Sequence, residues 1–238
     1  MKNITTYYID LDGTVYDKHN GMWEEMSTRI DRYIQEKIGI PENQVVPLRE
    51  KYYRQYGSTL RGLQVNHKID SEDYLAFVHD LDLDKYLTPD GELRKMLESV
   101  PQPKWILTNS DRNHSQRVLD ALGLNGIFEG IIDVWAMGYI PKPDIRVYQR
   151  ALRLTGNPNP AESIFIDDTL KNLGPAQQMG IKTVWIDSYT PHPHADISIP
   201  RLHELPKVLQ STPASPLNLP RNYAAGHAQS AGFPTNSP

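Results

Sequence analysis

Short apolar runs rich in β-branched residues alternate with helical patterns through most of the chain. Runs of this length and composition are typical of parallel strands that are covered on both faces. Six strands are predicted, in the stretches ITTYYID, WILTN, IFEGIIDVW, SIFID, KTVWID and DISI. Helices are predicted between them, over residues 110–122, 143–154 and 170–179. This alternation predicts an α/β fold, namely a doubly wound, Rossmann-like parallel sheet with right-handed crossovers.

One long segment between the first two predicted strands interrupts the alternation. Apolar residues at helical spacing predict four helices between residues 17 and 86, of which the third and fourth begin near Ser58 and Ser71. A fifth helix is predicted from Thr88 and Pro89. Because a simple crossover needs only one helix, residues 17–86 are predicted to form an inserted helical-bundle cap over the loop that follows the first strand.

The rest of the chain divides into a core and a tail. Residues 1–16 and 87–210 are predicted to form the α/β core domain. Residues 211–238 are rich in Pro, Ser, Asn, Ala and Gly, and they cannot bury enough apolar surface to offset the entropy of ordering them. This tail is therefore predicted to be disordered.

Composition narrows the class of protein further. The 238 residues are 39% apolar and 23% charged, which is ordinary for a globular protein. The net charge of -4 gives no basic field, so neither nucleic acid nor a membrane is expected as a partner. There is no cysteine, which excludes disulfides and cysteine-based metal sites or nucleophiles. With no signal-like or membrane-spanning apolar run, a cytoplasmic protein is expected.

Acidic residues follow two of the predicted strands. Asp10 and Asp12 end the first strand, and Asp167 and Asp168 end the fourth. Because ligands of open parallel sheets bind beyond the carboxyl ends of the strands, the four carboxylates are expected at one crevice. Acids this close repel one another unless a cation neutralises them, and Mg²⁺ is a hard ion that suits oxygen ligands. Turn formation by the Asp-Gly pair and N-capping by the second pair are simpler alternatives.

The second and third predicted strands end in groups that suit an anion. Thr108, Asn109 and Ser110 lie at a strand-to-helix junction, where free N–H groups bind phosphate readily. Lys142 follows the third strand between two prolines, and it is placed to neutralise both the carboxylates and a phosphoryl group. Plain helix capping and a solvated surface lysine are the alternatives for these two features.

Taken in order, these motifs resemble a known signature. Asp10-Leu11-Asp12-Gly13-Thr14, Thr108-Asn109, Lys142 and Asp167-Asp168 resemble the four motifs of the haloacid dehalogenase (HAD) superfamily of phosphohydrolases. Within it, the stretch KYYRQYGSTLRGLQVNHKIDSEDYLAFVHD and the IDDTLKNL motif are similar to the pyrimidine 5′-nucleotidase branch, which dephosphorylates UMP and CMP. The resemblance implies a small-molecule phosphate monoester, a nucleoside monophosphate, as substrate. A monomer or a homodimer is expected.

The resemblance also implies catalytic and metal-binding roles. Asp10 attacks phosphorus and forms an aspartyl-phosphate, while Asp12 protonates the leaving alkoxide and later takes a proton from water. Mg²⁺ is bound by Asp10, by the Asp12 backbone carbonyl and by Asp168, with Asp167 in or beside this set. Since a halide leaves without a proton, the presence of Asp12 favours phosphate ester chemistry over dehalogenation.

Further roles follow for the phosphate and the leaving group. Thr108 and Asn109 hold phosphate oxygens, Lys142 holds Asp10 and the phosphoryl group in register, and Asn172 orients water near the metal. Candidate substrate contacts at the cap are Arg61, His67 and Tyr16.

Two other functions stay open at this stage. One is a HAD phosphatase or phosphomutase for small sugar phosphates, since caps of this kind serve many monoesters. The other is a catalytically silent HAD-fold binding module. A silent module is expected to lack one or more key side chains, but Asp10, Asp12, Lys142 and Asp168 are all present.

Overall fold

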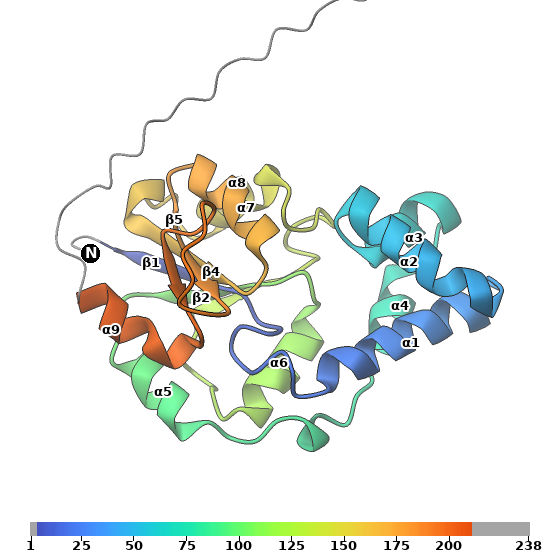
Figure 1. Cartoon of the computed structure of the whole chain (residues 1–238), viewed down its shortest axis with the longest axis horizontal. Coiled ribbons are helices and arrows are strands. Elements are labelled where there is room, and N and C mark those ends of the chain that lie inside the picture. Colours follow the sequence, from blue (N-terminus) through green and yellow to red (C-terminus); the bar gives the residue numbers. More distant parts are fainter. Residues whose placement is uncertain (1–3, 211–238) are drawn as a thin grey trace, which may run out of the picture.

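A six-stranded parallel sheet forms the centre of the molecule, and the computed structural model describes residues 4–210 (Figure 1). The strand order is β3-β2-β1-β4-β5-β6. The strands are β1 (Thr6–Ile9), β2 (Lys104–Leu107), β3 (Gly130–Ile132), β4 (Ser163–Asp167), β5 (Lys182–Ile186) and β6 (Ile197–Ile199). The chain moves outward from β1 to β3 and then outward the other way from β4 to β6, so the strand order reverses between β1 and β4. The predicted doubly wound α/β fold is confirmed.

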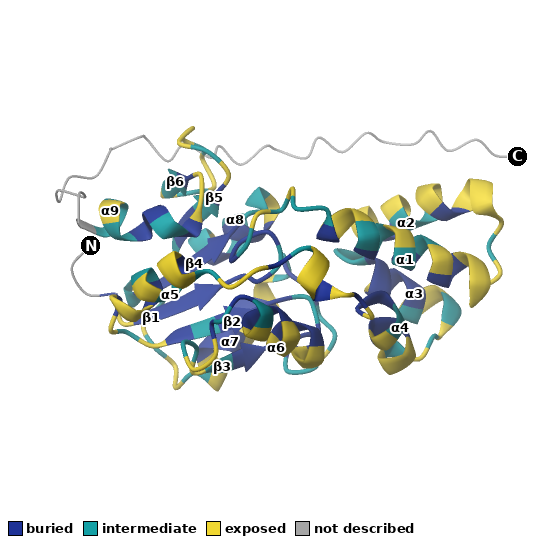
Figure 2. Cartoon of the chain, turned by 90° about the horizontal axis from the view of Figure 1, so that it is seen from below, coloured by how far each residue is buried: buried dark blue, intermediate teal, exposed yellow. Residues whose placement is uncertain are grey.

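Helices cover both faces of this sheet because side chains alternate along each strand. In β1, Tyr7 and Ile9 point into one apolar layer, which includes residues of α5 (Gly91–Glu98) and α6 (Arg112–Ala121). Tyr8 points into the other layer, which includes residues of α7 (Ile145–Leu154) and α8 (Leu170–Gln178). The short helix α9 (Leu205–Gln210) packs at the first face through Leu205. Figure 2 shows the strands buried between these helices.

Four helices that come between β1 and β2 in the sequence form a group to one side of the sheet, at the right of Figure 1. They are α1 (Met22–Glu36), α2 (Glu42–Tyr56), α3 (Thr59–His67) and α4 (Ser71–Val78), hereafter the helical insertion. Most members of a third apolar cluster belong to these helices, including Ile34, Leu63 and Tyr74. The insertion thus has a core largely of its own, and its status as a separate domain stays a prediction.

Side-chain caps set the starts of several helices. Ser58 accepts a hydrogen bond from the Arg61 N–H at the start of α3, and Asp70 accepts from the first turn of α4. The fifth helix begins at Gly91, so its predicted start at Thr88 and Pro89 is wrong. Asp90 accepts a 2.8 Å bond from the Leu93 N–H, and this capping bond places the first turn after the proline.

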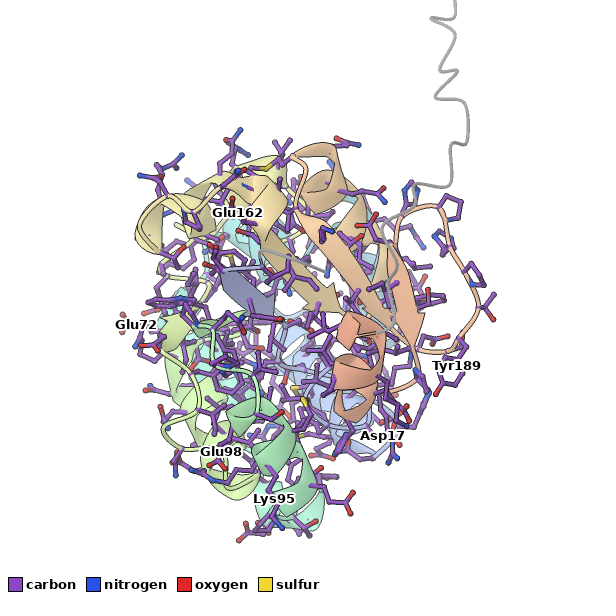
Figure 3. The ribbon with its side chains drawn as sticks, turned by 90° about the vertical axis from the view of Figure 1, so that its left-hand side faces the viewer. Asp17, Glu72, Lys95, Glu98, Glu162 and Tyr189 are labelled. Atoms are coloured by element: carbon purple, nitrogen blue, oxygen red, sulfur yellow. The ribbon has the colours of Figure 1, made fainter. Side chains whose placement is uncertain are left out.

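The outer surfaces of the helices carry the charged residues. In α5, Leu93 and Leu97 are buried, whereas Lys95 and Glu98 are exposed at the outside of the molecule (Figure 3). Short 3-10 segments complete the described chain, namely η1 (Leu83–Lys85), η2 (Pro160–Glu162) and η3 (Leu202–Glu204). None of the helices within residues 4–210 has the length and apolar character that a membrane crossing requires. The predicted disordered tail, residues 211–238, lies outside the described residues.

Candidate active site

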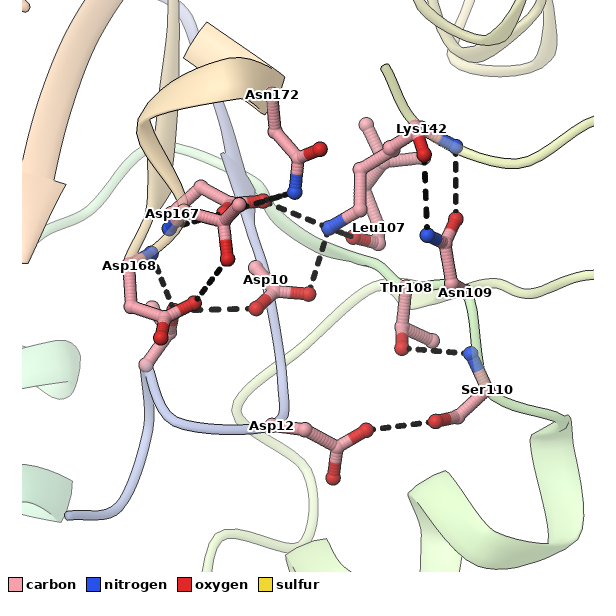
Figure 4. Close-up of polar contacts among 12 residues, drawn as sticks. Asp10, Asp12, Leu107, Thr108, Asn109, Ser110, Lys142, Asp167, Asp168 and Asn172 are labelled. Carbon is pink, nitrogen blue, oxygen red and sulfur yellow. Dashed lines mark hydrogen bonds and ion pairs between the residues drawn. The ribbon is translucent and has the colours of Figure 1, made fainter. Parts of the chain in front are cut away.

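Lys142 lies at the centre of a buried polar cluster at the carboxyl ends of the strands (Figure 4). Its Nζ donates to Asp10 Oδ1 at 2.6 Å, to Asp167 Oδ2 at 2.8 Å and to the Leu107 carbonyl at 2.8 Å. An ammonium has three hydrogens, so each of them has a partner. The lysine residue is only 2% exposed, which makes these contacts necessary to hold its charge away from water.

Asn109 fixes the backbone that carries this lysine. The Lys142 N–H donates to Asn109 Oδ1 at 2.8 Å, and Asn109 Nδ2 donates to the Lys142 carbonyl at 3.3 Å. Neighbouring Thr108 is buried and accepts a 3.0 Å bond from the Ser110 N–H. The side chain of Asn109 therefore supports Lys142, a role that the sequence did not indicate. Asn109 and Lys142 both line a cavity near Asp10.

Three carboxylates gather where the strand order reverses. One oxygen each of Asp10, Asp167 and Asp168 lies within 4.8 Å of the other two. Thr14 connects the two loops, because its hydroxyl donates to Asp10 Oδ2 at 3.2 Å and accepts from the Asp168 N–H at 3.1 Å. Gly13 makes the approach possible. Its φ of +82° lies in the left-handed region, and a Cβ there would come within 2.9 Å of Asp168 Oδ2.

The electrostatics of this group favour an added cation. Burial and the neighbouring carboxylates Asp167 and Asp168 raise the pKa of Asp10, although Lys142 opposes them. Burial and Asp167 raise the pKa of Asp168 to about 6. The pKa of Lys142 is also raised, because the attraction of Asp10 and Asp167 exceeds the cost of its burial. One lysine thus leaves the cluster with excess negative charge, and its all-oxygen donor set is able to hold a metal ion.

Asp167 is the most constrained of the three acids. Besides Lys142, it accepts bonds from Asn172 Nδ2 at 3.0 and 3.1 Å and from the Thr169 N–H at 2.8 Å. Asp168 is partly exposed, and its carboxylate accepts a 3.1 Å bond from the Thr169 hydroxyl. These contacts leave Asp168 freer than Asp167 to bind an ion directly. The Asn172 Oδ1 atom is buried without a partner among the described residues.

Asp12 has a different environment, two residues beyond Asp10. Its Oδ1 accepts from the Tyr16 hydroxyl at 2.8 Å and lies 3.0 Å from His114 Nε2, while its Oδ2 accepts from the Ser110 hydroxyl at 2.6 Å. Burial alone would raise the pKa of Asp12, but His114 and these three hydrogen bonds more than offset it, so the pKa is lowered. The lowered pKa favours the carboxylate form of Asp12, which is the form that accepts a proton, whereas donation of a proton requires the protonated form.

Sequence reasoning did not identify His114 or Ser110 as partners of Asp12. The available signal was the start of the helix that follows the second strand, where Asp111 caps α6 and His114 lies in its first turn. A residue in that turn faces the same crevice as the strand end. Tyr16 donates to Asp12 in this structure, and its predicted contact with the substrate stays a prediction.

A cavity of about 450 Å³ opens above these groups, between the sheet and the helical insertion. It is called the main cavity hereafter because it contains the motif residues. The core contributes Asp10, Asp12, Thr108, Lys142 and Asp168 to its lining. The insertion contributes mainly apolar and aromatic residues, including Trp23, Met26, Ile30, Tyr53 and Leu75. The cavity therefore has a charged floor and a largely apolar roof, a combination that suits a ligand with one anionic end.

Two predicted cap contacts lie elsewhere. Arg61 is exposed and donates to Gln64 at 3.3 Å, and His67 bonds the Tyr52 hydroxyl at 2.8 Å. Neither is among the residues that line the cavity. In α3 the buried residues include Leu60 and Leu63, which turns Arg61 toward solvent. Substrate contact by Arg61 and His67 stays a prediction, and their positions outside the cavity lining do not support it.

Comparison with known proteins supports the fold. Phosphate metabolism protein 8 of Saccharomyces cerevisiae is 31% identical over 189 residues, which cover 74% of this chain. The chain spans 59% of the length of that relative. A HAD phosphatase of Thermococcus onnurineus has a TM-score of 0.61 at 18% identity, over 87% of this chain and 98% of its own. An L-2-haloacid dehalogenase of Xanthobacter autotrophicus has a TM-score of 0.56 at 18% identity, over 88% of this chain and all of its own.

At these identities the two solved structures establish a shared fold, and they differ from each other in chemistry. The haloacid dehalogenase-like hydrolase family itself matches residues 4–180, a range that contains all four motifs and the helical insertion. Since that match covers most of the chain and the cluster around Lys142 has the expected members, the chain belongs to the haloacid dehalogenase-like hydrolases.

Proposed function

We propose that this protein is a Mg²⁺-dependent phosphomonoester hydrolase that works through an aspartyl-phosphate intermediate. The observation that carries the proposal is the pair of carboxylates at the end of β1. Asp10 is held by Lys142 at 2.6 Å, whereas Asp12 is surrounded by neutral donors and by His114. Two acids this close in such different environments suit two different roles.

Asp10 is the proposed nucleophile. Lys142 and Thr14 bond its two oxygens, which fixes the carboxylate at the floor of the cavity. Attack of an Asp10 oxygen on phosphorus forms the P–O bond of an aspartyl-phosphate and breaks the P–O bond to the leaving group. The Lys142 ammonium lies beside the Asp10 carboxylate, where it offsets the negative charge of the phosphoryl group as that group arrives.

Asp12 is the proposed acid and base. In its protonated form it gives a proton to the departing alkoxide oxygen, and as a carboxylate it takes one from the water that hydrolyses the intermediate. A halide needs no such proton, so Asp12 and its three partners favour a phosphate ester as substrate. The name of the yeast relative refers to phosphate metabolism, which agrees with this choice.

The metal proposal follows from the donor set. Asp10 and Asp168 would hold Mg²⁺, with the Asp12 carbonyl as a further ligand and Asp167 beside them, and Asn172 would orient nearby water. Oxygen ligands of this type suit Mg²⁺, which keeps several waters and neutralises phosphate charge when bound. The excess negative charge around Lys142 supports this assignment.

The finer proposal is a pyrimidine 5′-nucleotidase that converts UMP or CMP to nucleoside and phosphate. Its support is the similarity of the insertion sequence to that branch, together with the aromatic residues Trp23 and Tyr53 in the cavity roof. Aromatic side chains stack on bases. A phosphatase or mutase for small sugar phosphates is the alternative, and such a substrate offers no base on which these rings could stack.

Phosphate release from nucleoside monophosphates and sugar phosphates, with and without Mg²⁺, tests both levels of the proposal. We expect Mg²⁺-dependent release, preference for UMP and CMP, and no turnover by Asp10→Asn. Asp17→Asn is the matched control, because Asp17 is exposed and lies in the same loop. Full turnover by Asp10→Asn would disprove the assignment of Asp10 as the nucleophile. A preference for sugar phosphates would disprove only the nucleotidase assignment, and no release from any monoester would support the silent binding module.

A further inference from the structure

A chain of buried side chains leads from Asp12 to the place where the helical insertion rejoins the core. His114 Nε2 lies 3.0 Å from Asp12 Oδ1. The His114 ring stacks on the His79 ring, with centroids 4.1 Å apart and planes 18° from parallel. His79 Nδ1 in turn lies 2.5 Å from Asp111 Oδ2. The proposed function gives a role to Asp12 but none to the other three residues.

The two histidines belong to different parts of the molecule. His79 directly follows α4 and begins the segment that returns to the core, whereas Asp111 and His114 belong to the start of α6. Arg117, one turn further along α6, donates to the His79 carbonyl at 2.8 Å and also to the Leu81 carbonyl. Asp111, His114 and Arg117 are spaced by three, so they share one face of the helix. This face is where the insertion is attached to the core.

The His114 side chain makes a polar contact with Asp12 and a ring contact with His79. Its side chain is fully buried, and its Nδ1 has no hydrogen-bond partner among the described residues. The ring is therefore oriented by Asp12 at one edge and by the flat face of His79. Of these two contacts, the stack on His79 is the one that links His114 to the segment leaving the insertion.

The histidines also lie between two cavities. His79 lines the main cavity, and both His79 and His114 line a second cavity of about 510 Å³ on the side of Asp111 and Arg117. His79 therefore borders both cavities, and its ring is the flat face on which the His114 ring stacks. A displacement of His79 with the insertion therefore removes the ring that stacks on His114.

We propose that His114 is a positioning residue that holds Asp12 in the orientation needed for proton transfer, and that His79 makes this hold depend on the placement of the helical insertion. The inference rests on the proposed function, because it concerns proton transfer to a leaving alkoxide. In the arrangement described here the insertion is docked, His79 covers His114, and Asp12 is held. When the insertion moves away, the support of Asp12 is lost with it.

Comparing leaving groups tests the role of His114. p-Nitrophenolate leaves without a proton, whereas the 5′-alkoxide of UMP needs one. We expect His114→Leu to lower kcat for UMP by roughly 10- to 100-fold with little change in KM. The pre-steady-state burst of p-nitrophenolate should change by about threefold or less. His114→Gln keeps an N–H donor on a side chain of similar reach and should recover part of the UMP activity. Equal losses on the two substrates would mean that His114 is merely structural and would overturn the proposal.

A pair of variants at His79 tests the link to the insertion. His79→Phe keeps a flat ring on His114 but loses the bond to Asp111, and His79→Ala loses both. We expect His79→Ala to reproduce the substrate-selective loss of His114→Leu, with His79→Phe closer to the unmodified protein. Hydrogen exchange of backbone amides in residues 79–82 supplies a readout apart from activity, and it should be faster in His79→Ala. Unchanged UMP kinetics in His79→Ala together with faster exchange would overturn the coupling.

The matched control is His203→Leu. His203 Nε2 lies 2.9 Å from Asp90, so this variant removes a histidine–aspartate contact that does not line the main cavity. Its kinetics on both substrates should stay within about twofold of the unmodified protein. If the unmodified protein releases no phosphate from any monoester, the proposed function fails. If it is active and the His114 variants lose both substrates equally, only the positioning inference fails.

Discussion

Lys142 and Asp10 form a buried ion pair, 2.6 Å between Nζ and Oδ1, although 132 positions separate them along the chain. Asp10 is carried by the end of β1, and Lys142 lies in the loop between β3 and α7. A buried pair of charges gains little over a well-packed apolar pair, but removing one partner leaves the other charge uncompensated. The contact therefore makes both the fold and the cavity floor sensitive to either residue.

Lys142→Met should destabilise the metal-free protein strongly. It leaves Asp10 and Asp167 buried without their shared cation, at a cost of about 3–5 kcal/mol. In a chain of this length that corresponds to a Tm lower by about 10 °C, measured by thermal unfolding in a chelator. Lys51→Met is the control, since Lys51 is exposed on α2. Equal Tm values for the two variants would contradict the importance of the pair. Added Mg²⁺ should restore part of the lost Tm, because it supplies positive charge to the same acids.

Asp168 should give the metal-free protein a characteristic pH dependence. The pKa of Asp168 is raised to about 6 in the folded protein, above the usual 3.8 of an unfolded chain, so the folded state binds the extra proton. The free energy of unfolding should therefore fall as the pH rises from about 4 to about 6, and stay low above that range. Asp168→Asn removes this loss, so its Tm at neutral pH should exceed that of the unmodified protein by several degrees.

The same variant separates charge repulsion from metal binding. Mg²⁺ should raise the Tm of the unmodified protein more at pH 7 than at pH 5, and raise that of Asp168→Asn much less at either pH. Asp84→Asn is the control, because Asp84 is exposed in η1. If Asp168→Asn gains as much from Mg²⁺ as Asp84→Asn does, Asp168 is not a metal ligand.

Much of the fold and of the floor of the site could be predicted from the sequence because both follow from local rules. Apolar runs define strands, parallel strands end at one edge, and the motif residues follow those ends. This reasoning placed Asp10, Lys142 and Asp168 together across a wide separation in sequence. The predicted start of α5 was wrong because the helix begins after Asp90, whose side chain caps it. A capping bond of this kind depends on a single side chain.

The surroundings of Asp12 were harder to predict because they depend on packing between distant segments. His79 reaches His114 only because the insertion returns to the core beside α6. Arg61 was expected at the substrate, but the phase of α3 buries Leu60 and Leu63 and leaves Arg61 facing solvent. Residue type alone indicated chemistry in each case, whereas the direction of the side chain came from tertiary contacts.

Asp12→Ala should separate the two chemical steps. Loss of the general acid and base should lower kcat for UMP by about 10²- to 10⁴-fold. p-Nitrophenyl phosphate should still phosphorylate Asp10, because its leaving group needs no proton, and the aspartyl-phosphate should then accumulate. Intact-mass measurement after rapid acid quenching detects that adduct. Asp17→Ala is the control and should show normal turnover without accumulation, since Asp17 is exposed. An Asp12→Ala enzyme with unchanged UMP turnover would contradict the role of Asp12.

Tyr53→Ala should reveal whether the roof of the cavity recognises a base. Tyr53 lines the cavity, is 43% exposed, and has the Lys171 ammonium 3.3 Å from its ring centroid. Base stacking contributes about 1–3 kcal/mol, so the variant should raise KM for UMP by about 10-fold and leave KM for a small sugar phosphate nearly unchanged. Tyr189→Ala is the control, because Tyr189 is 65% exposed at the edge of the molecule (Figure 3) and does not line the cavity. Equal increases in KM for both substrates would mean that Tyr53 acts through the shape of the cavity. That result would contradict base recognition by this residue.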